Sequence, residues 1–512
     1  MTCYNSQRVP APLLFHTLGA NRALQSKGVE RSFTRGVAWV SVGSLSARAI
    51  TLISSVLLAR LLLPEHFGLF NMAIIVVNAV QMLPDLGLGQ ALIAHRGDTR
   101  KAANTIFLPV MFTATVAALV VCAVADTIAS VMKQPAVTPL LRALSLNIVV
   151  MAAASIPVAL MQKAQRWRAQ ALTEFAAPLV AAVVMVTLAA LGYGAWSIVW
   201  GNIARAITLA LTVWWLSSWR PRLVLDWSAL ADMFRFGRWI VLDRISAFAL
   251  LNTDTAYLAR WQGAQILGYY ALPYNWITLP IAQLVSQSNR VLFPVLSNID
   301  DEHLQRTTLL KACRLLSFLL SPVYFFWLIN AQVFVIGLFT GKWLPCVPVL
   351  QWLSVYGLAH GLAGGLLVSF YWATKRPQVA VYAYWASLAV ALAGLAVGRG
   401  HWGAVQVAQV FTAAMFVRSA FMIVGLIRFY GLRLRQVLRS VTDGWVPAAA
   451  ASAVAFGATR AVSLPVIAEL VIAALLHMNL YLLFYGWLRH RSPLVYYTRR
   501  QWKTVFPGYA EE

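Results

Sequence analysis

The sequence predicts an all-α integral membrane protein of about 14 transmembrane helices, and three observations support this. Sixty per cent of the 512 residues are hydrophobic and only 11% are charged, which does not describe a soluble globular protein. Apolar runs of roughly 20 residues, enough to cross a hydrocarbon core of about 30 Å, recur along the chain. Basic residues concentrate in every second loop. Helices are expected rather than a barrel, since barrel strands would be about ten residues long and alternating.

Fourteen apolar runs have the length of a spanning helix. They cover residues 36–59, 69–90, 104–125, 140–161, 175–192, 195–217, 237–259, 267–292, 315–338, 346–372, 378–398, 403–427, 445–460 and 466–488. The acidic stretch "IDDE" at 299–302 lies between two of these runs and predicts the solvent-exposed start of a helix.

The distribution of the 41 Lys and Arg residues predicts the orientation of these helices. Thirty of them fall at the two termini and in the loops after the second, fourth, sixth, eighth, tenth and twelfth runs. Seven fall at the opposite face, and four lie inside helices. Because cytoplasmic loops are enriched in Lys and Arg, both termini of this multi-pass membrane protein are expected in the cytoplasm.

The same distribution explains the net charge of +24 without nucleic acid. Basic loops that follow every second crossing are placed to contact anionic phospholipid headgroups. We therefore expect anionic phospholipids as partners and no nucleic acid.

An internal repeat relates the two halves of the chain. Residues 35–70 and 235–270 align without gaps at nine identities, including Arg35/Arg235, Trp39/Trp239, Arg60/Arg260 and Gly68/Gly268. Both copies begin at a cytoplasmic Arg and end at an outer Arg, so the seventh helix has the direction of the first. The halves are therefore expected to be parallel six-helix repeats, related by an axis along the membrane normal. Two such lobes around a central cleft suit alternating access, and a duplication kept only for packing is the alternative.

This repeat sets the expected domain organisation. We expect a cytoplasmic tail at 1–34, an N-lobe at 35–222 with helices 1–6, and a C-lobe at 223–440 with helices 7–12. Two peripheral helices at 441–490 and a cytoplasmic tail at 491–512 complete the chain. The two outer arginines that end the repeats, Arg60 and Arg260, are expected to be interfacial anchors.

Ionisable residues at membrane depth are the candidates for function. An ionisable side chain in a spanning helix costs roughly 2.5–3.5 kcal/mol on insertion scales, so it usually faces the protein interior or water. The first helix carries Arg48 at the centre of a polar stripe of Ser and Thr residues. The other candidates for substrate binding are Arg244, Arg205, Arg418, Asn78 and Asp85.

A cationic cavity favours an anionic cargo, because guanidinium binds diphosphate bidentately and more strongly where water is scarce. Asp243 and Asp254, eleven residues apart on one face of the seventh helix, are expected to receive a coupling cation or to pair with the arginines. There are two alternatives to cargo binding. The Ser and Thr stripes are helix-packing faces, or the arginines form structural Arg–Asp pairs.

Sequence motifs of catalysis are missing. The chain has no GxxxxGK[ST] loop, no HExxH and no GxSxG. Its four cysteines are scattered without metal-site spacing. We expect no cofactor, no metal site and no enzymatic activity. A chain with these features is expected to be a carrier.

Three stretches resemble one family. "LARLLLPEHFGLF" at 58–70, "LPDLGLGQALIAHRGD" at 83–98 and "GYGAWSIVWG" at 192–201 are similar, in order and spacing, to segments of Wzx-type polysaccharide transporters. These belong to the multidrug/oligosaccharidyl-lipid/polysaccharide exporter superfamily. The resemblance covers about residues 33 to 490. The second copy of the repeat departs at its turn, which reads Trp-Gln-Gly-Ala.

The resemblance implies a flippase that moves undecaprenyl-diphosphate-linked oligosaccharide repeat units to the periplasmic leaflet, for exopolysaccharide, capsule or O-antigen. It implies cargo binding by cationic residues of the central cavity, for which Arg48 and Arg244 are the matching candidates. It also implies a polymerase and a chain-length regulator of the same pathway as partners. The alternatives are a cation-coupled multidrug exporter of the same superfamily, a membrane glycosyltransferase or polymerase, and a structural membrane protein.

Overall fold

The computed structural model describes residues 43–85, 88–94, 97–222, 248–297, 299, 301–361, 366–462 and 465–490. Throughout this part of the chain the regular secondary structure is helical, without a strand. Ten helices in it are long and apolar enough to cross a membrane. The chain is a multi-pass membrane protein with the all-α fold that the sequence predicted.

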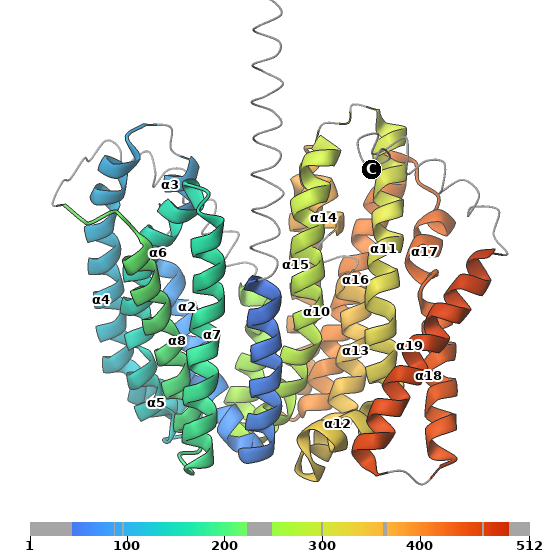
Figure 1. Cartoon of the computed structure of the whole chain (residues 1–512), viewed down its shortest axis with the longest axis horizontal. Coiled ribbons are helices and arrows are strands. Elements are labelled where there is room, and N and C mark those ends of the chain that lie inside the picture. Colours follow the sequence, from blue (N-terminus) through green and yellow to red (C-terminus); the bar gives the residue numbers. More distant parts are fainter. Residues whose placement is uncertain are drawn as a thin grey trace, which may run out of the picture.

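The first group of helices forms a bundle of its own, shown on the left of Figure 1. After the helix Gly43–Leu61, it consists of α2 (Pro64–Asp85), α3 (Leu88–Ala94), α4 (Thr99–Val131), α5 (Val137–Leu144), α6 (Leu146–Lys163), α7 (Trp167–Ala190) and α8 (Ala195–Leu216). Helix Gly43–Leu61 stands between this bundle and the second one. We call these helices together the N-lobe.

The second bundle, the C-lobe, begins with the helical residues 248–261. It continues with α10 (Gly263–Ser297), α11 (Glu302–Ile329), α12 (Ala331–Phe339), the 3-10 helix η1 (Gly341–Cys346), α13 (Val347–Gly361), α14 (Leu367–Ala373), α15 (Pro377–Gly398) and α16 (Ala404–Tyr430). The short α17 (Leu434–Thr442) connects it to α18 (Trp445–Arg460) and α19 (Val466–His490). The last two helices lie at the edge of the molecule, with α18 packed on α11 (Figure 1).

Every predicted run overlaps a helix of the structure, with local differences. The run 140–161 is divided into α5 and α6 at Ser145, and the run 315–338 is broken at Asn330, where α11 passes into α12. The sequence did not predict α17, because its alternating arginines and aliphatic residues lower the hydropathy of the segment. Residues 223–247 lie outside the described part, so the boundary between the lobes stays a prediction.

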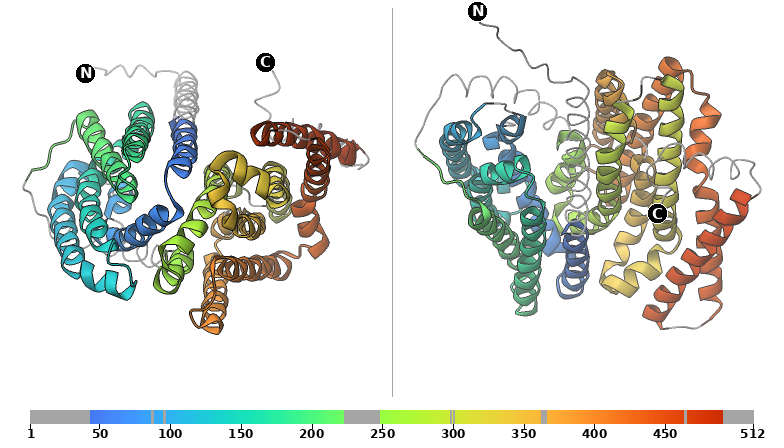
Figure 2. Two further views of the ribbon diagram at one scale, coloured as in Figure 1. Left: turned by 90° about the horizontal axis from the view of Figure 1, so that it is seen from below. Right: turned by 45° about the horizontal axis from the view of Figure 1, so that its top comes forward.

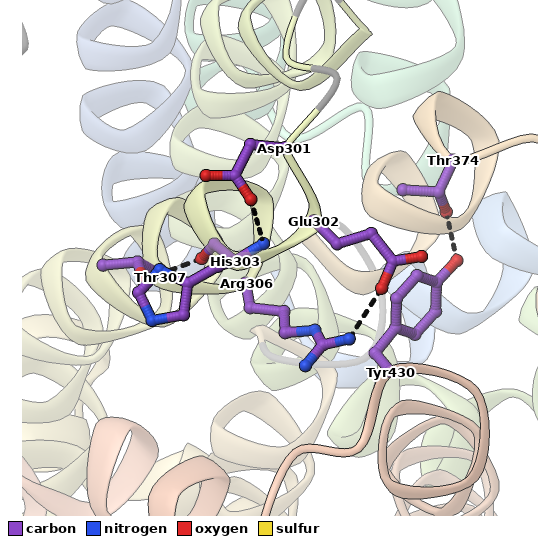
Figure 3. A network of polar contacts seen from close by, with 7 residues as sticks. All are labelled: Asp301, Glu302, His303, Arg306, Thr307, Thr374 and Tyr430. Carbon is purple, nitrogen blue, oxygen red and sulfur yellow. Dashed lines mark hydrogen bonds and ion pairs between the residues drawn. The ribbon is translucent and has the colours of Figure 1, made fainter.

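Acidic caps explain where two long helices begin. Asp98 precedes α4, and its Oδ1 accepts the backbone N–H groups of Arg100 at 2.9 Å and Lys101 at 3.2 Å. Asp301 caps α11 by accepting the N–H of His303 at 2.8 Å, and Glu302 in the first turn binds Arg306 (Figure 3). The acidic stretch at 299–302 is therefore a helix start, as predicted.

The two lobes meet where the internal repeat predicts equivalent positions. A Cβ atom added to Gly68 of α2 would lie 1.7 Å from the carbonyl oxygen of Ala264, the second residue of α10. A Cβ atom added to Gly268 of α10 would lie 1.8 Å from the carbonyl oxygen of Pro64, the first residue of α2. The two contacts are equivalent in the repeat register, because Gly68 corresponds to Gly268 and Pro64 to Ala264, each pair 200 residues apart. We call this symmetric close approach the glycine seam; α2 and α10 lie side by side in the middle of Figure 2.

Arg60 adds a second connection at the same end of the molecule, which we call the α12 end. Its Nε donates to the carbonyl of Leu338 at 2.8 Å and its Nη2 donates to that of Gly337 at 2.6 Å, at the last turn of α12. In return, Lys342 Nζ donates to the carbonyl of Arg60 at 2.7 Å. Arg60 of the N-lobe thus caps a helix of the C-lobe. The prediction of an interfacial anchor did not include this role. Arg260, by contrast, lies over its neighbour Trp261.

Substitution of the seam glycines tests how closely the lobes must approach. Gly68→Ala or Gly268→Ala is expected to destabilise the protein by about 1–3 kcal/mol, because backbone atoms of the other lobe occupy the space of the new methyl group. The midpoint of thermal unfolding in detergent measures the effect. Gly457→Ala in α18 is the control, since a Cβ there meets no atom within 4 Å. A seam variant as stable as the control would contradict the close approach.

Candidate functional site

Arg48 lies at the boundary between the lobes. It is half-buried on helix Gly43–Leu61, and its Nε donates to Oε1 of Gln283 on α10 at 2.5 Å. One turn earlier, Ser44 Oγ donates to the same oxygen at 3.1 Å. Two residues of the predicted polar stripe, Ser44 and Arg48, therefore contact another helix, and that helix belongs to the opposite lobe.

The N-lobe side of this site is built by α7. Gly43 packs so tightly on α7 that a Cβ would lie 2.9 Å from the Cα of Ala171. One turn further along α7, Glu174 is near enough to act electrostatically on Arg48. Its Oε1 accepts a hydrogen bond from Gln170 at 3.0 Å, and Arg48 has no ion pair within the described residues. Arg48 is thus close to a carboxylate without being neutralised by direct contact.

Arg48 retains unused hydrogen-bond donors. Of its three guanidinium nitrogens, only Nε has an acceptor among the described residues. A guanidinium carries five N–H donors in a planar fork, which fits two oxygen atoms of a carboxylate or phosphate. The geometry leaves the Nη1 and Nη2 edge of Arg48 available to an oxyanion.

Arg205 and Asn78 are exposed polar groups at membrane depth. Arg205, on α8, has an exposed side chain. One turn earlier on α8, Asn202 Oδ1 accepts a hydrogen bond from Asn147 of α6 at 2.7 Å, which fixes this part of α8 in the N-lobe. Arg205 and Asn78 are therefore both accessible at the surface of the N-lobe.

Three predicted site residues receive little or no structural description. Asp243 and Arg244 lie outside the described residues. Asp85 is the last residue of α2, and its side chain likewise lies outside the described part. Their roles stay predictions.

Asp254 is buried in the C-lobe with 1% of its surface exposed. Its Oδ2 accepts a hydrogen bond from the hydroxyl of Tyr270 at 2.6 Å, and its Oδ1 accepts the backbone N–H of Thr255 at 2.6 Å. Tyr274 stacks on Tyr270 with ring centroids 5.8 Å apart, and Tyr356 lies 6.3 Å beyond it. Donors therefore satisfy this carboxylate, and it has no ion pair with a described arginine.

Arg418 is also buried in the C-lobe, on α16, with no exposed surface. Its guanidinium carbon lies 3.7 Å from the centroid of the Tyr384 ring. Its Nε, Nη1 and Nη2 have no hydrogen-bond partner within the described chain. Because none of its surface is accessible, Arg418 does not contact a molecule between the lobes in this conformation.

The structure thus separates the embedded charges that the sequence grouped together. Arg48, Arg205 and Asn78 have accessible side chains, whereas Asp254 and Arg418 lie inside the C-lobe. The sequence prediction missed Gln283 and Glu174, which surround Arg48. Gln283 is 235 residues from Arg48, so the spacing within one helix gave no signal for this contact.

The end of the C-lobe opposite α12 carries a separate polar network. The hydroxyl of Tyr430, at the end of α16, donates to Thr374 Oγ1 at 2.6 Å (Figure 3). Arg376 lies over the rings of Phe429 and Tyr430 at 4.6 Å and 5.6 Å. These contacts hold the turn between α14 and α15 against the end of α16.

Removal of the Arg418 charge should stabilise the fold. A cation–π contact contributes about 0.5–2 kcal/mol, whereas a buried ion costs several kcal/mol. Arg418→Met should therefore raise the midpoint of thermal unfolding, by an amount equivalent to roughly 1 kcal/mol or more. Arg460→Met is the control, because Arg460 lies over Phe456 in an exposed position. A lower midpoint for Arg418→Met would show that the guanidinium has a stabilising partner.

Comparisons with known proteins identify relatives of this chain. The family model described as "Polysaccharide biosynthesis protein" matches residues 57–348. Lipopolysaccharide biosynthesis protein WzxC of Escherichia coli strain K12 is 27% identical over 340 residues, which cover 65% of this chain and 69% of WzxC. Succinoglycan biosynthesis transport protein ExoT of Rhizobium meliloti is 24% identical over 326 residues, 64% of this chain and 66% of ExoT. Teichuronic acid biosynthesis protein TuaB of Bacillus subtilis is 22% identical and covers 84% of this chain and 89% of TuaB.

Solved structures share the fold. The lipid II flippase MurJ in an inward closed conformation superposes with a TM-score of 0.69, covering 88% of this chain and 98% of that chain at 11% identity. A multidrug resistance transporter of the MATE family in an inward-facing conformation gives a TM-score of 0.58 at 14% identity, covering 77% and 98%. At these identities the likeness concerns the fold alone.

Proposed function

Because the chain belongs to the polysaccharide biosynthesis protein family whose model spans residues 57–348, we propose that it is a flippase for lipid-linked oligosaccharides. Its cargo is an oligosaccharide repeat unit on undecaprenyl diphosphate, which it moves to the periplasmic leaflet of the inner membrane. The relatives named for lipopolysaccharide biosynthesis and for succinoglycan transport support this assignment. The chain performs no bond chemistry of its own.

The observation that carries the proposal is the position of Arg48 between the lobes. A polyprenyl diphosphate presents two adjacent phosphate groups, which a guanidinium binds bidentately. Arg48 offers its Nη1 and Nη2 edge, and Arg205 adds a second accessible guanidinium on α8. Charge-assisted bonds of this kind are roughly twice as strong as neutral ones, so the two arginines favour an anionic headgroup.

Alternating access follows from the two lobes and the glycine seam. The seam and the Arg60 contacts hold the two lobes together at the α12 end in this conformation. We assign that end to the periplasmic side, because the loops at the opposite end carry most of the basic residues. Cargo then enters Arg48 from the cytoplasmic side, and its release requires separation of α2 from α10. Both termini are cytoplasmic in this assignment.

Further partners follow from the same proposal. Anionic phospholipids contact the basic cytoplasmic loops. The exported repeat unit is passed to a polymerase and a chain-length regulator of the same pathway. A coupling cation acts at Asp254, where protonation or cation binding changes the charge next to the Tyr270 hydroxyl.

Substitution of Arg48 tests the cargo site. In cells, Arg48→Ala should reduce periplasmic lipid-linked repeat units by about tenfold or more, since a charge-assisted contact contributes roughly 1.5–3 kcal/mol. Arg48→Lys should retain part of the activity. Arg260→Ala is the control, because Arg260 ends the second repeat and lies over Trp261. Normal export by Arg48→Ala at normal protein abundance would remove Arg48 from the site.

Substitution of Asp254 tests the coupling. Asp254→Asn keeps an acceptor for Tyr270 and removes the titratable charge, so export should lose its response to an imposed proton or sodium gradient. The measurement is cargo translocation in proteoliposomes with and without each gradient. Asp126→Asn, at an exposed ion pair with Arg142, is the matched control. An unchanged gradient response of Asp254→Asn would place the coupling elsewhere.

A further inference from the structure

One side-chain oxygen connects the two lobes at the cargo site. Oε1 of Gln283 accepts hydrogen bonds from Arg48 Nε at 2.5 Å and from Ser44 Oγ at 3.1 Å. Both donors are on helix Gly43–Leu61 of the N-lobe, and the acceptor is on α10 of the C-lobe. An amide oxygen has two lone pairs, so these two donors saturate it.

The acceptor in this contact is the neutral amide oxygen of Gln283, so a charged oxygen of a ligand can replace it on Arg48. A phosphate oxygen forms a charge-assisted bond with guanidinium that is roughly twice as strong as a bond to a neutral amide. A diphosphate has several oxygen atoms, so one that binds the free Nη1 and Nη2 edge of Arg48 brings a further charged oxygen that competes favourably with Gln283 for Nε. A carboxylate at position 283 would not be displaced in this way, because it would form an ion pair with Arg48.

The carboxylate near Arg48 does not bridge the two lobes. The carboxylate that acts on Arg48 is Glu174, on α7 of the N-lobe, and its Oε1 already accepts from Gln170. Glu174 moves with the same lobe as helix Gly43–Leu61, which packs on α7 at Gly43 and Ala171. Gln283 is the partner of Arg48 that crosses between lobes, so exchange of Gln283 for cargo breaks a contact between them.

We propose that Gln283 occupies the place of a cargo phosphate oxygen on Arg48, and that cargo binding releases helix Gly43–Leu61 from α10. This inference rests on the proposed flippase function and adds a coupling step to it. Without cargo, the two hydrogen bonds hold the lobes together beside the site. With cargo, an oxygen of the diphosphate replaces Gln283 on Nε of Arg48, and the conformational equilibrium shifts toward states in which the lobes separate there.

Two substitutions at position 283 should act in opposite directions. The probe is farnesyl diphosphate, binding to purified full-length protein. Gln283→Glu should raise the Kd at least about tenfold, because the new carboxylate competes with the diphosphate for Arg48. Gln283→Leu should leave the Kd unchanged or lower it, because it removes the competing acceptor. Gln262→Glu, whose native amide donates to Gly400 at the α12 end, controls for an added charge.

Equal loss of affinity in both variants would overturn the proposal, because it would show that Gln283 supports the site as a structural group. An unchanged Kd for Gln283→Glu would also overturn it.

Spin-label distances separate this inference from the flippase assignment. Labels at the exposed positions Leu172 on α7 and Trp372 on α14 report the separation of the lobes. Without any ligand, Gln283→Leu should shift the distance distribution to longer values than in the wild type, and Gln283→Glu should not. This result would support the lobe contact even if the wild type failed to bind farnesyl diphosphate. An identical distribution in Gln283→Leu and wild type would contradict it.

Discussion

The close approach of α2 and α10 at Gly68 and Gly268 is the constraint on which the arrangement of the lobes depends. Each glycine faces the backbone at the start of the other helix, so neither helix can carry a side chain at that position. The contact is symmetric because the two positions are equivalent in the internal repeat. It brings the first turns of α2 and α10 together at the α12 end and lets the rest of each lobe diverge from there. Arg60 reinforces it by capping α12, so the repeat motif builds the contact between the lobes at the α12 end.

Environment, rather than residue type, distinguishes the embedded arginines. Arg48 and Arg418 both occupy the middle of apolar runs, and insertion into a membrane is costly for each. Arg48 keeps an accessible edge and exchangeable hydrogen bonds at the boundary between lobes. Arg418 is enclosed by its lobe and has an aromatic ring as its neighbour. Of the two, only Arg48 is accessible to an anion in this conformation.

The sequence was sufficient for the fold and for the polar stripe that contains Arg48. Run length and loop charge predicted the spanning helices, and the spacing of the repeat predicted the equivalence of Gly68 and Gly268. Helical spacing placed Arg48 at the centre of a polar stripe. The partner of that stripe was beyond such reasoning, because Gln283 is 235 residues away and no local period relates the two helices. The burial of Arg418 also depends on how α13, α15 and α16 pack, which a single helical pattern does not contain.

Direct observation of transport tests the central claim, that the lobes carry a lipid-linked oligosaccharide across the bilayer. Purified protein is reconstituted into vesicles whose inner leaflet holds an undecaprenyl-diphosphate-linked oligosaccharide, and a membrane-impermeant lectin outside reports its arrival in the outer leaflet. Vesicles with the protein should expose the oligosaccharide with time, faster than protein-free vesicles. An exposure rate equal to that of protein-free vesicles, for oligosaccharides from the native pathway, would contradict the account.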